Sequence, residues 1–190
     1  MARTSTRDAI MAAAVSVAAR HGISGSSMDE IAEEASVAKG SLYYHFPSKD
    51  AIFENVLHAG FDRLADAIRD ARVGVTGYVA LRAATEATLG VLHQNPARAK
   101  IVASEVFRTD RPWVDAIAPA RSSVVVLYRD VLREVARESG RAQAAEGITE
   151  TAGAAFFGAI AGAGLEWLLF HPEQPLEAVA DQVLLLAPPR

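Results

Sequence analysis

Apolar residues recur at helical spacing along the chain, and glycine, proline and capping residues divide the pattern into separate segments. Pro119 lies inside one segment, where we expect a kink or a short break, and the Ala-rich stretch 141–147 is expected to be a connection. The pattern predicts an all-α protein of about nine helices. The expected helices span residues 5–21, 28–35, 39–46, 49–72, 78–94, 97–108, 112–139, 148–170 and 176–186.

The second and third expected helices are short and are separated only by residues 36–38, the length of the turn in a helix-turn-helix. Ser27 and Glu30 have the spacing of a capping box at the start of the second helix. In the third helix, Leu42 and Phe46 are expected to pack inward, and Gly40 would let a base edge or a phosphate come close. The remaining side chains favour a DNA-binding helix, with ordinary packing as the alternative for the tyrosines: Lys39, Ser41, Tyr43, Tyr44 and His45.

Residues 7–57 resemble the DNA-binding domain of the tetracycline-repressor (TetR) family of transcriptional regulators. The resemblance rests on the strings 20–22, 27–32, 37–46 and 48–53. It implies an N-terminal three-helix helix-turn-helix DNA-binding domain, residues 1–47, and a larger C-terminal helical ligand-binding and dimerisation domain, residues 48–190. The helix 49–72 would link the two.

Two positions depart from the family pattern. Ser36 stands where the family usually has glycine, so this residue must adopt a left-handed conformation or the turn must take another form. Ala38 stands where the family usually has a capping serine or threonine, and the missing cap should cost about 1 kcal/mol.

The resemblance implies a sequence-specific regulator, most simply a repressor, whose third helix enters the major groove at each half-site of a palindromic double-stranded operator. Ser41 and Tyr43, beside Gly40, are the candidates for contacts to base edges. Arg3 and Arg7 could follow the DNA backbone or the minor groove. Phosphates would be held by side chains and helix N-termini, namely Ser27, Lys39, Tyr44, His45 and Lys49.

The charge balance does not add support for DNA binding. The whole chain has a net charge of −4. Residues 1–50 contain five Lys and Arg against six Asp and Glu, so the expected DNA-binding domain is not basic. This balance motivates an alternative, a helical small-molecule-binding protein or enzyme whose DNA-binding module is vestigial.

The segment 148–170 is the most apolar, and residues 152–165 carry no charge. This run is shorter than the roughly 20 residues that a bilayer span needs, so we expect a buried or interface helix and no membrane segment; a membrane-associated adaptor is the alternative. Its small residues suggest close helix-to-helix assembly. The resemblance implies that the last two helices pair with those of a second copy in a homodimer, whereas they would otherwise only complete the monomer core.

Bulky aromatic side chains near the predicted helix breaks of the C-terminal part could line a small-molecule pocket. The resemblance ranks four of them highest as contacts to a small apolar or amphipathic effector, which would release the operator with helix 49–72 carrying the shift: Phe107, Trp113, Tyr128 and Phe156.

Catalytic patterns are weak in this sequence. Glu105, Glu166 and His93 could form an acid-base pair, but their positions give no reason to expect them to meet. The five histidines lack metal-ligand spacing, and there is no nucleophile elbow, P-loop or dinucleotide-binding fingerprint. We therefore expect no enzyme, no cofactor and no metal. The chain has no cysteine, which fits a cytoplasmic protein.

Overall fold

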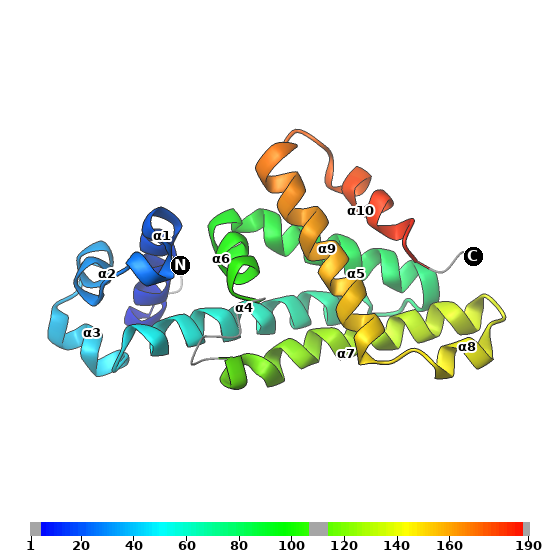
Figure 1. Ribbon diagram of the computed structural model, residues 1–190, viewed down its shortest axis with the longest axis horizontal. Coiled ribbons are helices and arrows are strands. Elements are labelled where there is room, and N and C mark those ends of the chain that lie inside the picture. Colours follow the sequence, from blue (N-terminus) through cyan, green and yellow to red (C-terminus); the bar gives the residue numbers. More distant parts are fainter. Residues whose placement is uncertain (1–4, 107–113, 188–190) are drawn as a thin grey trace. The chain divides into compact units, whose positions relative to one another are not determined.

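The computed structural model describes residues 5–106 and 114–187, and the side chains of residues 5–101 and 115–187 (Figure 1). All regular secondary structure in these residues is α-helical, which confirms the predicted all-α class. The helices are α1 Thr6–Gly25, α2 Met28–Glu34, α3 Lys39–His45, α4 Lys49–Ala71, α5 Gly77–Gln94, α6 Pro96–Val106, α7 Val114–Glu138, α8 Ala142–Glu146, α9 Glu150–Phe170 and α10 Leu176–Leu184.

Two of the sequence-based expectations need correction. The described residues form ten helices, because the Ala-rich stretch expected as a connection contains the short helix α8. The break expected at Pro119 does not occur, because α7 continues through it. Pro119 lies close to the start of α7, where its missing N–H removes only one backbone hydrogen bond. The end of the first helix expected at Gly22 is confirmed by the non-helical backbone of that residue (φ 70°, ψ 165°), beyond which α1 continues to Gly25 after a kink.

The described residues divide into two compact units. Unit 1 consists of residues 1–60 and 97–118, and unit 2 of residues 61–96 and 119–190. Buried apolar side chains of α1 to α4 form the core of unit 1, as their helical spacing predicted. Those exposed by 1% or less include Ile10, Ala14, Val17, Ile31, Leu42, Phe46, Ile52 and Phe53.

Unit 2 contains α5, α9 and α10, which pack on one another, together with parts of α4 and α7. Glycines let α9 approach its neighbours closely. A Cβ atom at Gly153 would meet the backbone of α7 at Val125 and Arg129, and one at Gly164 would meet Leu92 of α5. α9 is long and apolar enough to cross a membrane by length and composition, yet Phe156, Ile160 and Trp167 are buried inside unit 2.

In the turn between α2 and α3, Ser36 adopts the left-handed conformation, one of the two possibilities that its position in the sequence left open. Ser36 has φ 55°, and its N–H donates to the Glu33 carbonyl at 3.0 Å, while the Val37 N–H donates to the Ala32 carbonyl at 3.0 Å. These two bonds form a Schellman motif, the arrangement that usually has glycine at the position of Ser36. The hydrogen bonds therefore hold an L-residue in a conformation that its Cβ atom disfavours.

We expect Ser36→Gly to raise the free energy of unfolding by about 0.5–1 kcal/mol, because glycine removes the strain of positive φ but increases the entropy of the unfolded chain. Urea unfolding followed by circular dichroism would measure this change. The matched control is Ala35→Gly at φ −75°, which should destabilise by about 0.5–1 kcal/mol. A lower unfolding midpoint for Ser36→Gly would contradict the assignment of strain.

Candidate nucleic-acid interface

The helix α3 is held by two buried side chains and exposes most of the others. Leu42 is fully buried and Phe46, directly after the helix, is 1% exposed. On the outer side, Tyr43 is 52% and Tyr44 85% exposed. Large aromatic side chains this exposed on a short helix gain little from packing within the chain, so they are available to another molecule.

The remaining predicted residues of α3 share this surface. Lys39 and Gly40 are exposed, whereas Ser41 and His45 are half-buried. A Cβ atom at Gly40 would have no neighbour within 4 Å, so the first turn of α3 is open to an approaching surface. The His45 ring lies edge-on to Tyr44, with centroids 5.3 Å apart. The helix starts at Ala38 with no side-chain cap, as the sequence predicted.

The capping box at the start of α2 is also present. The Glu30 N–H donates to the Ser27 hydroxyl at 3.2 Å, and the Ser27 N–H donates to the Glu30 carboxylate at 2.9 Å. Hydrogen bonds from Ser27 lower the pKa of Glu30. Ser27, expected at a phosphate-binding helix end, therefore already has its hydroxyl in the cap.

Two residues expected at DNA phosphates have structural partners. The Arg7 guanidinium donates to the Asn55 side chain and lies 5.2 Å from the centroid of the Phe46 ring. The Lys49 ammonium donates to the backbone carbonyls of Ser24 at 3.2 Å and Ser26 at 2.8 Å. These interactions join α1, the loop before α2, and α4. Arg3 lies outside the described residues.

The Lys39 ammonium is paired with the Asp29 carboxylate of α2 at 2.7 Å. Sequence reasoning missed Asp29 as a member of this surface, since the two residues are ten positions apart on different helices. The signal that could have found the pair is the helix-turn-helix itself, which brings the start of α2 near the start of α3.

In unit 2 the structure brings together two of the four predicted effector contacts. The ring centroids of Tyr128 on α7 and Phe156 on α9 lie 5.8 Å apart, and Phe157 stacks on Tyr128 at 6.1 Å. Phe107 and Trp113 lie outside the described residues. Phe156 also lines an apolar groove of about 370 Å³, whose other lining residues are Leu132, Ile148, Ala152, Ala155, Ala159 and Leu186.

Tyr128 is fully buried but has hydrogen-bond partners on α5. Its hydroxyl lies 2.7 Å from the Thr88 hydroxyl and donates to the Ala84 carbonyl at 3.0 Å. Sequence reasoning missed Thr88, because a hydroxyl partner on another helix cannot be read from spacing along the chain. Burial raises the pKa of Tyr128 well above its usual range.

Tyr128→Phe should lower the free energy of unfolding at pH 7 by about 1–3 kcal/mol, since Thr88 and Ala84 lose a buried partner. From about pH 10 upward the unfolded chain releases a tyrosine proton that the folded chain keeps, so the wild type should lose stability through this group, with a slope that rises toward about 1.4 kcal/mol per pH unit. Tyr128→Phe should lack that component. Urea unfolding between pH 7 and 10.5 tests this, with exposed Tyr43→Phe as control. Equal slopes for Tyr128→Phe and wild type would contradict it.

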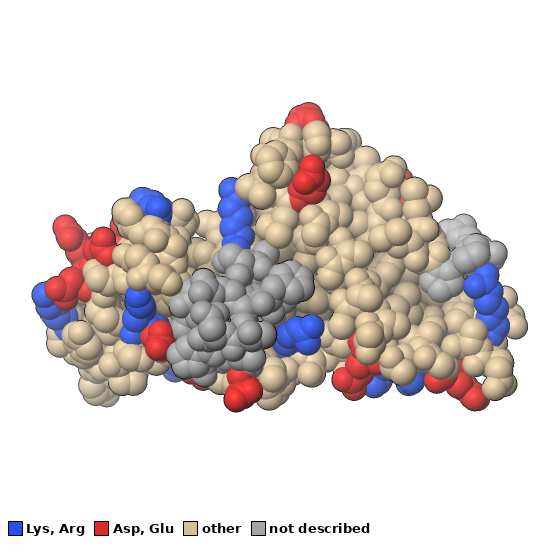
Figure 2. Space-filling model, in the orientation of Figure 1, with Lys and Arg blue, Asp and Glu red and all other residues tan. Residues whose placement is uncertain are grey.

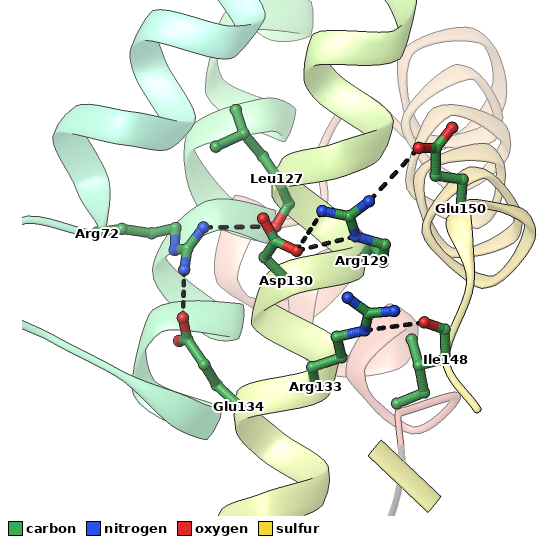
Figure 3. A network of polar contacts seen from close by, with 8 residues as sticks. All are labelled: Arg72, Leu127, Arg129, Asp130, Arg133, Glu134, Ile148 and Glu150. Carbon is green, nitrogen blue, oxygen red and sulfur yellow. Dashed lines mark hydrogen bonds and ion pairs between the residues drawn. The ribbon is translucent and has the colours of Figure 1, made fainter. Parts of the chain in front are cut away.

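A polar network fixes the end of α4 within unit 2 (Figure 3). The Arg72 guanidinium donates to the Glu134 carboxylate at 2.7 Å and to the Leu127 carbonyl at 3.4 Å. Glu134 also accepts from the Gly77 N–H at 3.3 Å, and Glu138 accepts from the Tyr78 N–H at 2.8 Å. Two carboxylates of α7 thus occupy the N-terminus of α5, where the helix dipole favours negative charge.

The same network continues to the start of α9. Arg129 is paired with Asp130 at 2.7 Å and lies 3.4 Å from Glu150, and the Arg133 side chain donates to the Ile148 carbonyl at 2.9 Å (Figure 3). Of the candidate acid-base residues, His93 stacks on Trp167 at 4.9 Å and Glu166 lies 3.8 Å from His171, whereas the side chain of Glu105 lies outside the described residues.

Comparison with known proteins finds a matching family model and similar transcriptional regulators. The family model of bacterial regulatory proteins, tetR family, matches residues 10–56. The chain is 37% identical over 62 residues to the biofilm operon icaADBC HTH-type negative transcriptional regulator IcaR of Staphylococcus aureus, a match that covers 33% of each protein. It is 28% identical to the HTH-type transcriptional repressor BepR of Brucella suis, over 92% of this chain and 85% of that protein.

The fold of the whole chain is similar to that of the transcriptional regulator FadR from Bacillus subtilis, solved in complex with stearoyl-CoA. The TM-score is 0.79 at 23% identity, and the alignment covers 94% of this chain and 95% of that one. The helix-turn-helix of α2 and α3 lies inside the matched residues 10–56, and the remaining helices follow the same fold. Residues 10–56 thus match the tetR family of bacterial regulatory proteins, and the chain as a whole is similar in sequence to a transcriptional repressor and in fold to a transcriptional regulator.

Proposed function

We propose that the protein is a homodimeric repressor that binds a palindromic operator through α3 and leaves it when a small apolar or amphipathic effector binds unit 2. The observation that carries the proposal is the exposed surface of α3, which presents Tyr43, Tyr44 and Lys39 from a helix fixed by Leu42 and Phe46. This is the segment that the tetR family model matches.

On this surface Ser41 and Tyr43, beside the open position of Gly40, would contact base edges, while Lys39, Tyr44 and His45 would hold phosphates. Contacts of Ser27 and Arg3 to the DNA backbone remain part of the proposal, although the Ser27 hydroxyl already caps α2 and Arg3 lies outside the described residues. Lys49 and Arg7 are better explained as residues that hold α1 and α4 in place, because a phosphate contact would compete with the interactions they already make.

The effector part of the proposal is supported by the buried aromatic cluster of Tyr128, Phe156 and Phe157 and by the apolar groove beside it. Such surfaces favour apolar or amphipathic molecules. The similar fold of Bacillus subtilis FadR holds stearoyl-CoA, an amphipathic molecule, and BepR is a repressor. An effector releases the operator only if it binds the DNA-free arrangement more tightly.

The dimer part rests on the outer faces of α9 and α10. Cβ atoms at Gly158 and Gly162 would meet nothing within 4 Å, so another helix could approach closely there. At the helix ends Phe170 is 65% and Leu185 75% exposed. Figure 2 shows that the visible surface over α9 and α10 carries few charged side chains. Apolar surface of this kind is typical of a homodimer interface.

The test is selection of bound sequences from a random duplex pool by the purified protein, with the size of the complex determined. An enriched inverted repeat bound by two copies supports the proposal, and its loss in Lys39→Ala with Tyr43→Ala assigns the binding to α3. Release of the selected duplex by long-chain acyl compounds would support the effector part. If no motif is enriched at low salt, the alternative of a ligand-binding protein with a vestigial DNA-binding module holds.

A further inference from the structure

The basic side chains of the helix-turn-helix all have partners within the protein. Residues 5–50 contain four Lys and Arg and six Asp and Glu. Arg7 contacts Asn55 and Phe46, and Lys49 donates to two backbone carbonyls. Arg20 pairs with Glu34 at 2.7 Å and Lys39 pairs with Asp29 at 2.7 Å. In the free protein, this domain therefore offers DNA no unengaged Lys or Arg among its described residues.

The pair of Lys39 and Asp29 joins α2 to α3, but its side chains are more exposed to solvent than those of the pair of Arg20 and Glu34. Glu34 accepts from both Arg20 and Ser16 and so ties α2 to α1. By contrast, the side chains of Lys39 and Asp29 are 66% and 63% exposed. A solvent-exposed pair is weak and exchanges readily with other ions. Asp29 nevertheless raises the pKa of Lys39, through the hydrogen bond first and its charge second.

We propose that Asp29 is a specificity-determining residue, which competes with DNA phosphates for the ammonium group of Lys39. This inference rests on the proposed function of α3 as a DNA-reading helix. A phosphate must displace the carboxylate before Lys39, the first residue of α3, contacts the backbone. The displacement occurs on the operator, where the other contacts of α3 bring a phosphate close to Lys39.

On other sequences Lys39 stays with Asp29. The affinity for unrelated DNA comes almost entirely from contacts between Lys or Arg side chains and phosphates. Because the ammonium group of Lys39 stays with Asp29, one such contact is missing and this affinity is lower. The excess of acidic residues in this domain then has a function, because it keeps binding to unrelated DNA weak. Specific binding depends instead on the contacts that α3 makes with the operator. Figure 2 shows acidic and basic side chains next to each other on the surface of α2 and α3.

The experiment uses the full chain, its selected operator and a random duplex of the same length, with affinity measured by fluorescence anisotropy from 50 to 200 mM salt. Asp29→Asn removes the charge and keeps the shape. The matched control is Glu33→Gln on the same helix, because it changes net charge equally and Glu33 has no ion pair among the described residues. A third variant combines Asp29→Asn with Lys39→Met.

Asp29→Asn should raise the affinity for the random duplex about two- to fivefold, with a smaller gain for the operator. It should also steepen the slope of log affinity against log salt on the random duplex by about 0.9, the value for one further phosphate contact. Glu33→Gln should leave the slope unchanged. In the Lys39→Met background, Asp29→Asn should no longer have an effect of its own.

Equal effects of Asp29→Asn and Glu33→Gln, with operator binding intact, would overturn this inference alone. An undiminished effect of Asp29→Asn in the Lys39→Met background would do the same, because the carboxylate would then act without Lys39. Failure of the wild type to select any duplex would contradict the proposed function, and with it the role of Asp29.

Discussion

Phe46→Ala is expected to lower the free energy of unfolding of unit 1 by about 3–5 kcal/mol and to abolish binding to the selected operator. Phe46 is 1% exposed, so the truncation leaves a cavity as well as losing burial. The Arg7 guanidinium lies over its ring, so that contact is lost too. A small helical module has little stability to spare, and α3 is too short to persist alone.

Urea unfolding and anisotropy with the operator would measure both effects. The matched control is Tyr44→Ala, because Tyr44 is 85% exposed and its loss should change stability by less than about 0.5 kcal/mol. Tyr44→Ala should still weaken operator binding, which separates a contact to DNA from support of the fold. A Phe46→Ala protein with wild-type stability would show that α3 is held by other means.

Gly153→Val is expected to lower the free energy of unfolding by about 2–3 kcal/mol. The glycine lies where α9 meets α7. A Cβ atom there would lie 2.8 Å from the backbone nitrogen of Arg129 and closer still to the Val125 carbonyl oxygen. Both atoms belong to the backbone of a long helix, which cannot rotate away as a side chain can. The two helices must therefore separate, and the packing of Phe156 and Phe157 against Tyr128 would loosen.

Thermal and urea unfolding at fixed protein concentration would measure the loss. Gly90→Ala is the matched control in α5, because the nearest atom to its added Cβ would be Leu176 Cδ1 at 4.0 Å. That substitution should stabilise the helix, by about 0.8–1 kcal/mol. Equal stability of Gly153→Val and wild type would mean that α7 and α9 are not packed this closely in solution.

Features that depend on residues near one another in sequence could be predicted. The capping box of Ser27 and Glu30, the inward side of α3 at Leu42 and Phe46, and the uncapped start at Ala38 all follow from spacing within one or two turns. At Ser36 the sequence left two conformations open. Hydrogen bonds to carbonyls at the end of α2 favour the left-handed conformation. The intrinsic backbone preference of serine, which is all that the sequence position gives, does not include these bonds.

Partners from distant segments could not be predicted. A charge at a helix start looks the same in a sequence whether it faces solvent or the protein. The sequence therefore predicts DNA contacts for Arg7 and Lys49 and does not reveal their partners within unit 1. The pairs of Lys39 with Asp29 and of Tyr128 with Thr88 each join different helices. They follow from the tertiary fold, which brings chemically matched groups within 3 Å of each other.

The anchoring of Arg72 by Glu134, together with the two carboxylates at the start of α5, has a mechanical consequence. α4 ends directly before Arg72, so this end of the helix is tied to α7 and α5. A helix of 23 residues is about 34 Å long. Within unit 2, any shift of α7 or of the start of α5 is therefore passed directly to this end of α4.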